Sequence, residues 1–157
     1  GLPITIIRYS GGYGPTYTAS WANSPVNIFI ETALRGESIP IHGDGTQTRS
    51  FTHIDDLVDG TMKVLQSSYS DGEIVNLGSD NSISMINLAY LVWREVGETG
   101  KPNLQFVPYT DFSNLYEDVH HRKVDCSKAR FLLGYHPRID LEEGVHLLAQ
   151  WYKAERK

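Results

Sequence analysis

Residues 33–60 read ALRGESIPIHGDGTQTRSFTHIDDLVDG, and this stretch decides the class of fold. Two short segments of strand-like composition, 38–42 and 48–54, flank the turn Gly43-Asp-Gly45. A helix is expected to follow at once, with Asp55 as its N-cap. This helix has four apolar residues on its expected inward face: Leu57, Val58, Met62 and Leu65. Strands that lead directly into helices are typical of α/β or α+β domains.

The same alternation of strands and helices continues on both sides of this stretch. Further strands are expected at 3–9, 73–77 and 103–107, and further helices at 25–36, 84–96, 125–134 and 140–151. The residues at the helix starts support these boundaries, because Ser24, Ser84, Asp125 and Asp140 are suitable N-caps. The strand at 3–9 reads as buried, although nothing resembles the complete βαβαβ half that a parallel sheet around it needs.

The composition is that of an ordinary globular domain, with 157 residues and a formal net charge of −5. This charge argues against a nucleic-acid or membrane-surface partner, since either would favour a basic face. No apolar run reaches the roughly 20 residues that span a bilayer, and no signal peptide follows Gly1. The single cysteine, Cys126, suits a reducing compartment. These features predict a cytoplasmic protein without a membrane or nucleic-acid partner.

Arg8 to Pro15 read RYSGGYGP, and three glycines in four positions raise the question of a phosphate-binding loop. A dinucleotide fingerprint needs G-x-G-x-x-G between a strand and a helix, so that the phosphate meets the helix N-terminus. Here the glycine spacing is different, and Pro15 and a polar loop follow instead of a helix. The segment therefore fails as a phosphate cradle and reads better as a tight turn.

Arg49 is a candidate anion-binding residue within the central stretch. It is expected near the start of a strand, where a guanidinium can hold a phosphate through two hydrogen bonds. The alternative is a surface arginine that pairs with Asp44 or Asp55. The residues alone leave both interpretations open.

Arg122 is a second candidate, in the loop EDVHHRK at 117–123. Together with Tyr116 it could hold a charged ligand that carries a ring, through ion pairing and stacking. The alternative is a solvated charged loop. His120 and His121 are adjacent but have no third ligand nearby, so no metal site is predicted.

Taken in order, several stretches resemble one family across nearly the whole chain: the extended short-chain dehydrogenase/reductases that act on nucleotide sugars. The family includes epimerases, 4,6-dehydratases and UDP-glucuronate decarboxylases. The matching stretches are GLPITIIRY (1–9), YGP (13–15), the central stretch (33–60), VNLGS (75–79), RKVDCSKARFLLGYHP (122–137) and LEEGV (141–145). The segment GDGTQTRSF, with LGYHP at a suitable distance, is specific to this family.

The resemblance implies an NAD-dependent enzyme with a catalytic tyrosine in a Y-x-x-x-K pair and a glycine-rich NAD fingerprint. Neither feature is present, since none of the nine tyrosines has a lysine four residues later. We therefore expect the C-terminal, substrate-binding part of a larger enzyme, with no catalytic residue of its own and with NAD bound mostly by an absent N-terminal half. Residues 1–15 would be the end of the Rossmann half and the crossover, and residues 16–157 the substrate-binding domain.

The resemblance also assigns substrate contacts by position. Arg49 resembles the arginine that contacts the diphosphate of the substrate, and Arg122 resembles a second basic residue that closes on the nucleotide. Pro40, Ile41 and His42 match the strand that lines the base pocket.

Three further positions follow from the same resemblance. Asn76 matches a polar residue near the substrate, and Ser10 falls where the chain passes the nicotinamide of NAD. Gly11 stands where relatives often have an asparagine that hydrogen-bonds the substrate. Because glycine has no side chain, the sugar or the nucleotide is expected to be held differently here.

The resulting hypothesis is a UDP- or dTDP-sugar-binding domain of an NAD-dependent epimerase/dehydratase, which forms a homodimer as the full enzyme. The residues do not distinguish an epimerase from a dehydratase or a decarboxylase. The alternative is a free-standing, non-catalytic module that binds a nucleotide or a partner protein.

Overall fold

The structure is a computed structural model that describes residues 2–15, 24–111 and 118–155. In chain order the elements are β1 (Ile6–Tyr9), β2 (Gly12–Tyr13), α1 (Pro25–Leu34), β3 (Ile39–His42), β4 (Thr48–Ser50), β5 (Thr52–His53), α2 (Ile54–Gln66), the 3-10 turn η1 (Ser68–Ser70), β6 (Ile74–Leu77), β7 (Ser82–Ser84), α3 (Met85–Glu95), β8 (Leu104–Val107), the 3-10 turn η2 (Tyr109–Asp111), α4 (Ser127–Leu133) and α5 (Leu141–Glu155). The predicted mixture of short strands and helices is confirmed. No helix in the described part of the chain has both the length and the apolar character needed to cross a membrane.

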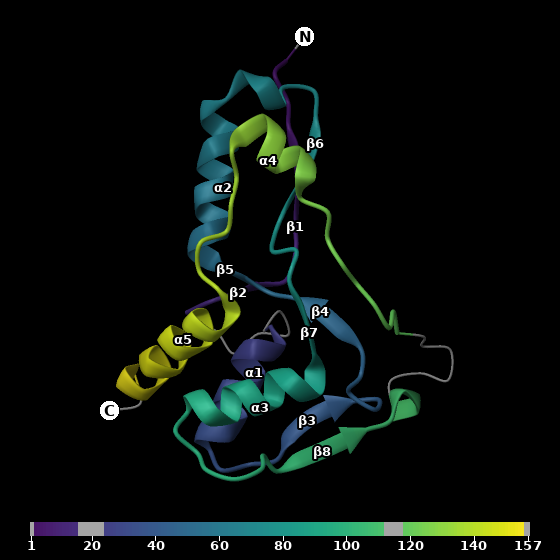
Figure 1. Cartoon of the computed structure of the whole chain (residues 1–157), viewed down its shortest axis with the longest axis vertical. Helices are drawn as coiled ribbons and strands as arrows, with labels where there is room; N and C mark the ends of the chain where they lie inside the picture. Colours follow the sequence, from purple (N-terminus) through teal and green to yellow (C-terminus); the bar gives the residue numbers. More distant parts are fainter. Residues whose placement is uncertain (1, 16–23, 112–117, 156–157) are drawn as a thin grey trace.

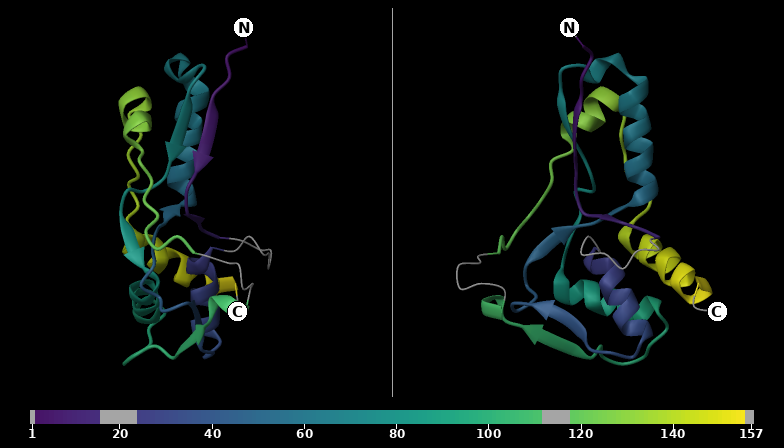
Figure 2. Two further views of the ribbon diagram at one scale, coloured as in Figure 1. Left: turned by 90° about the vertical axis from the view of Figure 1, so that its right-hand side faces the viewer. Right: turned by 180° about the vertical axis from the view of Figure 1, so that it is seen from behind.

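Figure 1 shows an elongated molecule with two regions. The upper region contains β1, β6, α2 and α4, and the lower region contains α1, α3, α5, β3 and β8. The strands pair two by two: β1 with β6, β2 with β5 and β3 with β8 are parallel, and β4 with β7 is antiparallel. The two further views in Figure 2 show β1 at one side of the upper region, next to β6 and α2.

The lower region is built around the packing of three helices. α1, α3 and α5 contact one another and enclose a core that includes Ile30, Leu88 and Leu148, each at most 1% exposed. α1 begins as expected, since the Ser24 hydroxyl accepts a hydrogen bond from the Val26 amide. This region therefore has the buried apolar surface that a stable core requires.

The upper region has its own, smaller core. Its buried members are Leu57, Val64, Val75, Leu77, Ala129 and Tyr135. Gly60 allows α2 to approach this core, because a Cβ at Gly60 would lie 2.8 Å from Cε2 of Tyr135. The helix, the β1–β6 pair and α4 are thus joined by a few close contacts.

Asp56 joins the upper region to the segment that leads into α5. It is 2% exposed, and its two carboxylate oxygens accept hydrogen bonds from the backbone amides of Arg138 (2.9 Å) and Ile139 (3.0 Å). A buried carboxylate is stable only when it is paired in this way.

Two expectations about the central stretch were wrong. The expected strand at 48–54 is divided at the buried Phe51, because β4 pairs with β7 whereas β5 pairs with β2. The expected N-cap Asp55 is replaced by His53, whose Nδ1 accepts a hydrogen bond from the Asp55 amide. The helix therefore starts two residues earlier than the pattern predicted.

The expected inward face of α2 was also wrong in part. Leu57 is buried, but Val58, Met62 and Leu65 are 52%, 46% and 74% exposed. The reason is that α2 lies on the β1–β6 pair through Leu57, Gly60 and Val64, so the neighbouring apolar stripe faces outward. The predicted burial of the strand at 3–9 fails similarly, because among the described residues β1 pairs only with β6, and Ile4, Ile6 and Tyr9 are exposed.

Candidate functional site

A pocket of about 300 Å³ lies in the lower region, against β3, β4 and the starts of α1 and α3. One part of its wall is apolar, and it consists of Pro25, Ile28, Phe29, Pro40 and Met85. The other part is polar, and it consists of His42, Gln47, Arg49, Tyr109, Asp118 and Arg122. The pocket thus combines an apolar wall with converging charged groups, as expected for a ligand site.

A single β-bridge brings the two predicted arginines together. Thr48 pairs in parallel with His121, since the Thr48 amide donates to the His120 carbonyl (2.8 Å) and the Thr48 carbonyl accepts from the Arg122 amide (3.3 Å). Oγ1 of Thr48 and Nδ1 of His121 lie 3.2 Å apart. Arg49 and Arg122 each follow a bridged residue, and both line the pocket. The fold therefore brings two arginines that are 73 positions apart in the sequence to one pocket.

Arg49 is paired, but with neither of the two carboxylates that its sequence neighbourhood suggested. Its Nη2 donates to Oδ1 of Asp118 at 2.5 Å, and its Nη1 donates to the carbonyls of Thr48 (2.8 Å) and Val119 (2.7 Å). Asp44 instead accepts hydrogen bonds from Thr46, in the turn after β3. The idea of an arginine paired with Asp44 or Asp55 is therefore wrong about the partner.

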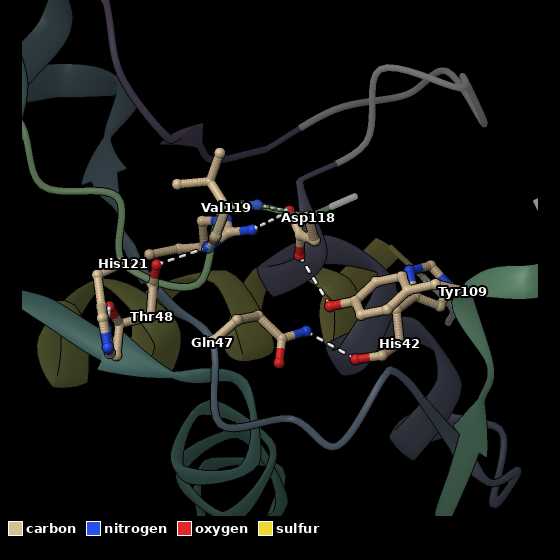
Figure 3. Close-up of polar contacts among 8 residues, drawn as sticks. His42, Gln47, Thr48, Tyr109, Asp118, Val119 and His121 are labelled. Carbon is tan, nitrogen blue, oxygen red and sulfur yellow. Dashed lines mark hydrogen bonds and ion pairs between the residues drawn. The ribbon is translucent and has the colours of Figure 1, made fainter. Parts of the chain in front are cut away.

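Asp118 is held from two sides. Figure 3 shows the Tyr109 hydroxyl directed at Asp118, and Oδ2 accepts this hydrogen bond at 2.8 Å. Oδ1 accepts from Nη2 of Arg49. Burial by itself would raise the pKa of this carboxyl. The Tyr109 hydrogen bond and the positive charge of Arg49 outweigh that effect and hold the pKa below its ordinary value.

The strand β3 presents two of its three predicted residues to the pocket. Pro40 and His42 line it, whereas the side chain of Ile41 is fully buried in the core of the lower region. This follows from the two-residue period of a strand. The buried Gln47 supports the same wall, because its Nε2 donates to the His42 carbonyl at 2.7 Å.

Sequence reasoning missed Gln47, Tyr109 and Asp118, all of which line the pocket. Asp118 lies inside the charged loop that was singled out for Arg122, so its proximity to a basic group was the available signal. Tyr109 and Gln47 had no such signal, because their position depends on how η2 and the turn after β3 fold back. Tyr116, named as a stacking partner of Arg122, lies outside the described residues.

Ser10 and Gly11 do not line the pocket but lie against β4 and β5. The Ser10 carbonyl accepts from Oγ1 of Thr52 (3.0 Å), and the Gly11 carbonyl accepts from the Thr52 amide (2.9 Å). Gly11 has φ +59°, and a Cβ there would lie 1.9 Å from the carbonyl oxygen of Ser50. The backbone path at position 11 thus requires glycine, which explains why no asparagine stands there.

Asn76 is also separate from the pocket. It lies on β6 in the upper region, and its Nδ2 donates to the Asp125 carbonyl at 2.9 Å. Of the predicted contact residues, the structure therefore brings together Pro40, His42, Arg49 and Arg122, while Asn76 and the Ser10–Gly11 pair lie elsewhere.

The glycine segment does not fit the pyrophosphate of NAD. The space beside each glycine is filled by the protein, since a Cβ at Gly12 would lie 2.9 Å from Cδ1 of Leu57 and one at Gly14 would lie 2.5 Å from Cγ2 of Ile54. The next helix, α1, starts only at Pro25. Within the described ranges, no strand–glycine–helix cradle is available for a dinucleotide.

Comparisons with known proteins identify the family to which this chain is similar. A model of the NAD dependent epimerase/dehydratase family matches residues 1–78. The UDP-N-acetyl-alpha-D-glucosaminuronate decarboxylase of Bacillus cytotoxicus is 31% identical over 154 residues, which are 98% of this chain and 47% of that protein. The chain thus spans about half the length of this curated relative.

Two solved structures are similar to the chain throughout. UDP-glucose 4-epimerase from Thermotoga maritima, determined with UDP-glucose, has a TM-score of 0.85 at 29% identity and covers 98% of this chain and 47% of its own. UDP-glucuronic acid 4-epimerase from Bacillus cereus, determined with a UDP-sugar analogue and NAD, has a TM-score of 0.83 at 29% identity, with 98% and 46% covered. The family expected from the motifs is confirmed, and the chain belongs to the NAD-dependent epimerase/dehydratase family.

Proposed function

We propose that the pocket binds the nucleotide diphosphate part of a nucleotide sugar, and that the chain is the substrate-binding part of an NAD-dependent epimerase, dehydratase or decarboxylase. The observation that carries this proposal is the convergence of Arg49 and Arg122 on one pocket through the Thr48–His121 bridge. Two guanidinium groups beside an apolar wall match a ligand with a doubly anionic segment and a flat ring.

Each part of the pocket has a distinct role in this proposal. Arg49 and Arg122 hold the diphosphate, since guanidinium groups bind phosphate oxygens through paired hydrogen bonds. Pro40, His42 and the apolar wall hold the base. Binding energy from these groups, which are remote from the reacting sugar carbons, would orient the sugar for reaction.

The contacts predicted for Ser10, Gly11 and Asn76 with the substrate or the cofactor stay predictions. Ser10 and Gly11 contribute backbone rather than side-chain contacts, next to β4 and β5. Nδ2 of Asn76 donates to the Asp125 carbonyl, so this hydrogen bond must break before Nδ2 can contact a substrate. We therefore propose that the pocket residues dominate the affinity for nucleotide.

Hydride transfer is proposed to require residues beyond this chain. In the family resemblance the proton acceptor is a tyrosine with a lysine four residues later, and no tyrosine here has that spacing. When NAD is bound it supplies the hydride acceptor, and the present residues would bind and orient the substrate. The exposed stripe Val58, Met62 and Leu65 supports this view, because a contiguous apolar surface is typical of a face that packs against another part. The homodimer and the cytoplasmic location likewise stay proposals.

Calorimetric titration with UDP-glucose and dTDP-glucose tests the proposed ligand. Arg49→Ala and Arg122→Ala are each expected to weaken binding by about tenfold or more, because a charge-assisted hydrogen bond contributes about 1.5–3 kcal/mol. Arg138→Ala is the matched control, since its side chain is 77% exposed and lies outside the pocket. Unchanged affinity in both pocket variants would remove the two arginines from the site.

An assay of turnover distinguishes the proposal from a competent enzyme in this chain alone. The purified chain is expected to convert no UDP- or dTDP-sugar in the presence of NAD. Binding without turnover also fits the alternative hypothesis of a free-standing, non-catalytic module. The lack of a Y-x-x-x-K pair favours that alternative. A polypeptide with the family's NAD fingerprint and catalytic pair can then be added. If turnover appears, the chain is part of an enzyme and not a free-standing module.

A further inference from the structure

We propose that Tyr109 and Asp118 are positioning residues for Arg49: they hold its guanidinium in the orientation that receives a phosphate. The inference rests on the proposed nucleotide-binding function and deepens it. Neither residue was expected to matter from the sequence, and both lie in the same pocket as Arg49.

The first link is the ion pair between Arg49 and Asp118. The two side chains are only 16% and 12% exposed, so water screens their charges less than in a surface pair. Asp118 also orders its own segment, because its Oδ1 accepts a hydrogen bond from the Val119 amide (2.8 Å). Val119 in turn accepts from Nη1 of Arg49 through its carbonyl. The carboxylate and the next backbone carbonyl therefore hold both terminal nitrogens of the guanidinium.

The second link is the contact between Asp118 and Tyr109. Tyr109 is placed by the turn after β3, since Gly43 has φ +66° and a Cβ there would lie 2.4 Å from Cε2 of the Tyr109 ring. The ring thus occupies space that any other residue at position 43 would fill. Its hydroxyl donates to Oδ2 of Asp118, as Figure 3 shows. A continuous series of contacts therefore runs from the β3 turn to Arg49.

The third step concerns the guanidinium N–H groups of Arg49 that these contacts do not use. Three of the five guanidinium N–H groups of Arg49 donate to Thr48, Asp118 and Val119. Within the described residues this leaves the Nε–H and one N–H of Nη2 for a ligand. Because the guanidinium is planar and its other side is held, these two donors keep a defined direction. A phosphate can then bind without first ordering the arginine, which lowers the entropic cost of binding.

The opposing interpretation is that Asp118 merely competes with the phosphate for Arg49. The two ideas predict opposite results for Asp118→Asn. If Asp118 positions Arg49, the variant binds UDP more weakly. If it competes, removing its negative charge makes UDP bind more tightly.

The decisive experiment compares UDP with uridine, which lacks the phosphates, on the Tyr109→Phe variant of the full chain. UDP affinity is expected to fall by about three- to tenfold, because one hydrogen bond to a charged group is lost. Uridine affinity, followed by NMR titration, is expected to stay within about twofold, because the aromatic ring that faces the pocket is retained. In an Arg49→Ala background, Tyr109→Phe is expected to cause no further loss of UDP binding, since contacting residues are coupled. Tyr90→Phe, a change of an exposed tyrosine on α3, is the control.

Several outcomes would overturn the inference while leaving the proposed function intact. These are unchanged UDP binding in Tyr109→Phe, equal losses for UDP and uridine, an additive loss in the Arg49→Ala background, and tighter UDP binding in Asp118→Asn. If the unaltered chain binds no UDP, the proposed function fails instead. The positioning itself is then still tested without ligand, because Tyr109→Phe should speed the rotation of the Arg49 guanidinium seen in its ¹⁵N side-chain signals. Unchanged rotation in that measurement would reject it.

Discussion

The lower and upper regions of the molecule differ in how completely they cover their apolar residues. Among the residues that the structure describes, the lower core contains 17 buried residues drawn from three helices and the adjoining strands, whereas the upper core contains six. The upper region also exposes Val58, Met62 and Leu65 on α2, and Ile4 and Ile6 before and within β1.

The upper region therefore depends more on packing against other surfaces than the lower region does. The lower region encloses its core and carries the pocket, so its geometry follows from contacts within the chain. In the described part of the chain, the upper region has a strand with one partner and a helix with an uncovered apolar stripe, and both are features that further packing would stabilise. Four measurements test this difference between the two regions.

The largest expected effect is on the core of the lower region. Leu148→Ala should lower the free energy of unfolding by about 2–5 kcal/mol, because Leu148 is 1% exposed and its removal leaves a cavity. Leu65→Ala on α2 is the matched change, and it should cost less than about 0.5 kcal/mol since Leu65 is 74% exposed. Urea denaturation measures both. Equal losses would show that the α2 stripe is covered in solution and would break the contrast.

The next effect concerns the junction between the regions. Asp56→Asn should cost roughly 1–3 kcal/mol of unfolding free energy, because an amide has one acceptor oxygen where the carboxylate accepts two backbone amides. Asp55→Asn is the control, since the Asp55 side chain is 74% exposed. Hydrogen exchange at the Arg138 and Ile139 amides should also become faster in the Asp56 variant. Protected amides at both positions would mean that Asp56 does not hold the junction.

A difference of similar size is expected where the chain passes from β1 to β2. Gly11→Ala and Gly36→Ala both place an L side chain at positive φ (+59° and +69°), which costs about 1–2 kcal/mol. Only Gly11 also meets a neighbour, because a Cβ at Gly36 has nothing within 4 Å. Gly11→Ala should therefore lose about 1–3 kcal/mol more than Gly36→Ala in thermal or chemical unfolding. Similar losses would show that the crossing adjusts easily.

The smallest effect is the pH dependence of the Arg49–Asp118 pair. The pKa of Asp118 is lower in the folded chain than in the unfolded one, where it is about 3.9. Its stabilising contribution is therefore fully present above that value and disappears as the pH falls through the lowered folded pKa. The difference in unfolding free energy between the unaltered chain and Asp118→Asn should be constant from pH 7 to pH 5 and shrink below about pH 4. A difference that stays constant down to pH 2 would show that the charge of Asp118 contributes nothing.

The elements were largely predictable because their signals are local. Ser24 and Pro25 mark the start of α1, and Gly134, in the left-handed conformation, ends α4 as expected. The orientation of α2 was not predictable, because Leu57 and Val58 are equally apolar and only the position of the β1–β6 pair selects between them. The strand β2 was missed because two residues that pair with β5 carry no periodic pattern.

The candidate site, like the elements, could be predicted only in part from the sequence. Arg49 and Arg122 could be found because an arginine within a distinctive motif is visible in the sequence. Their convergence, and the identity of Asp118 as the partner of Arg49, could not be found, because these depend on a bridge between Thr48 and His121.

The helices, most of the strands, the family and the two arginines could be predicted from the sequence alone, because capping residues, periodicity and motifs act over a few neighbouring positions. The buried face of α2, the need for glycine at position 11, and the way Tyr109 and Asp118 hold Arg49 became clear only in the folded chain. These features come from contacts between residues 9 to 75 positions apart, such as Tyr109 with Asp118 and Gly60 with Tyr135, and such contacts form only when the whole chain packs.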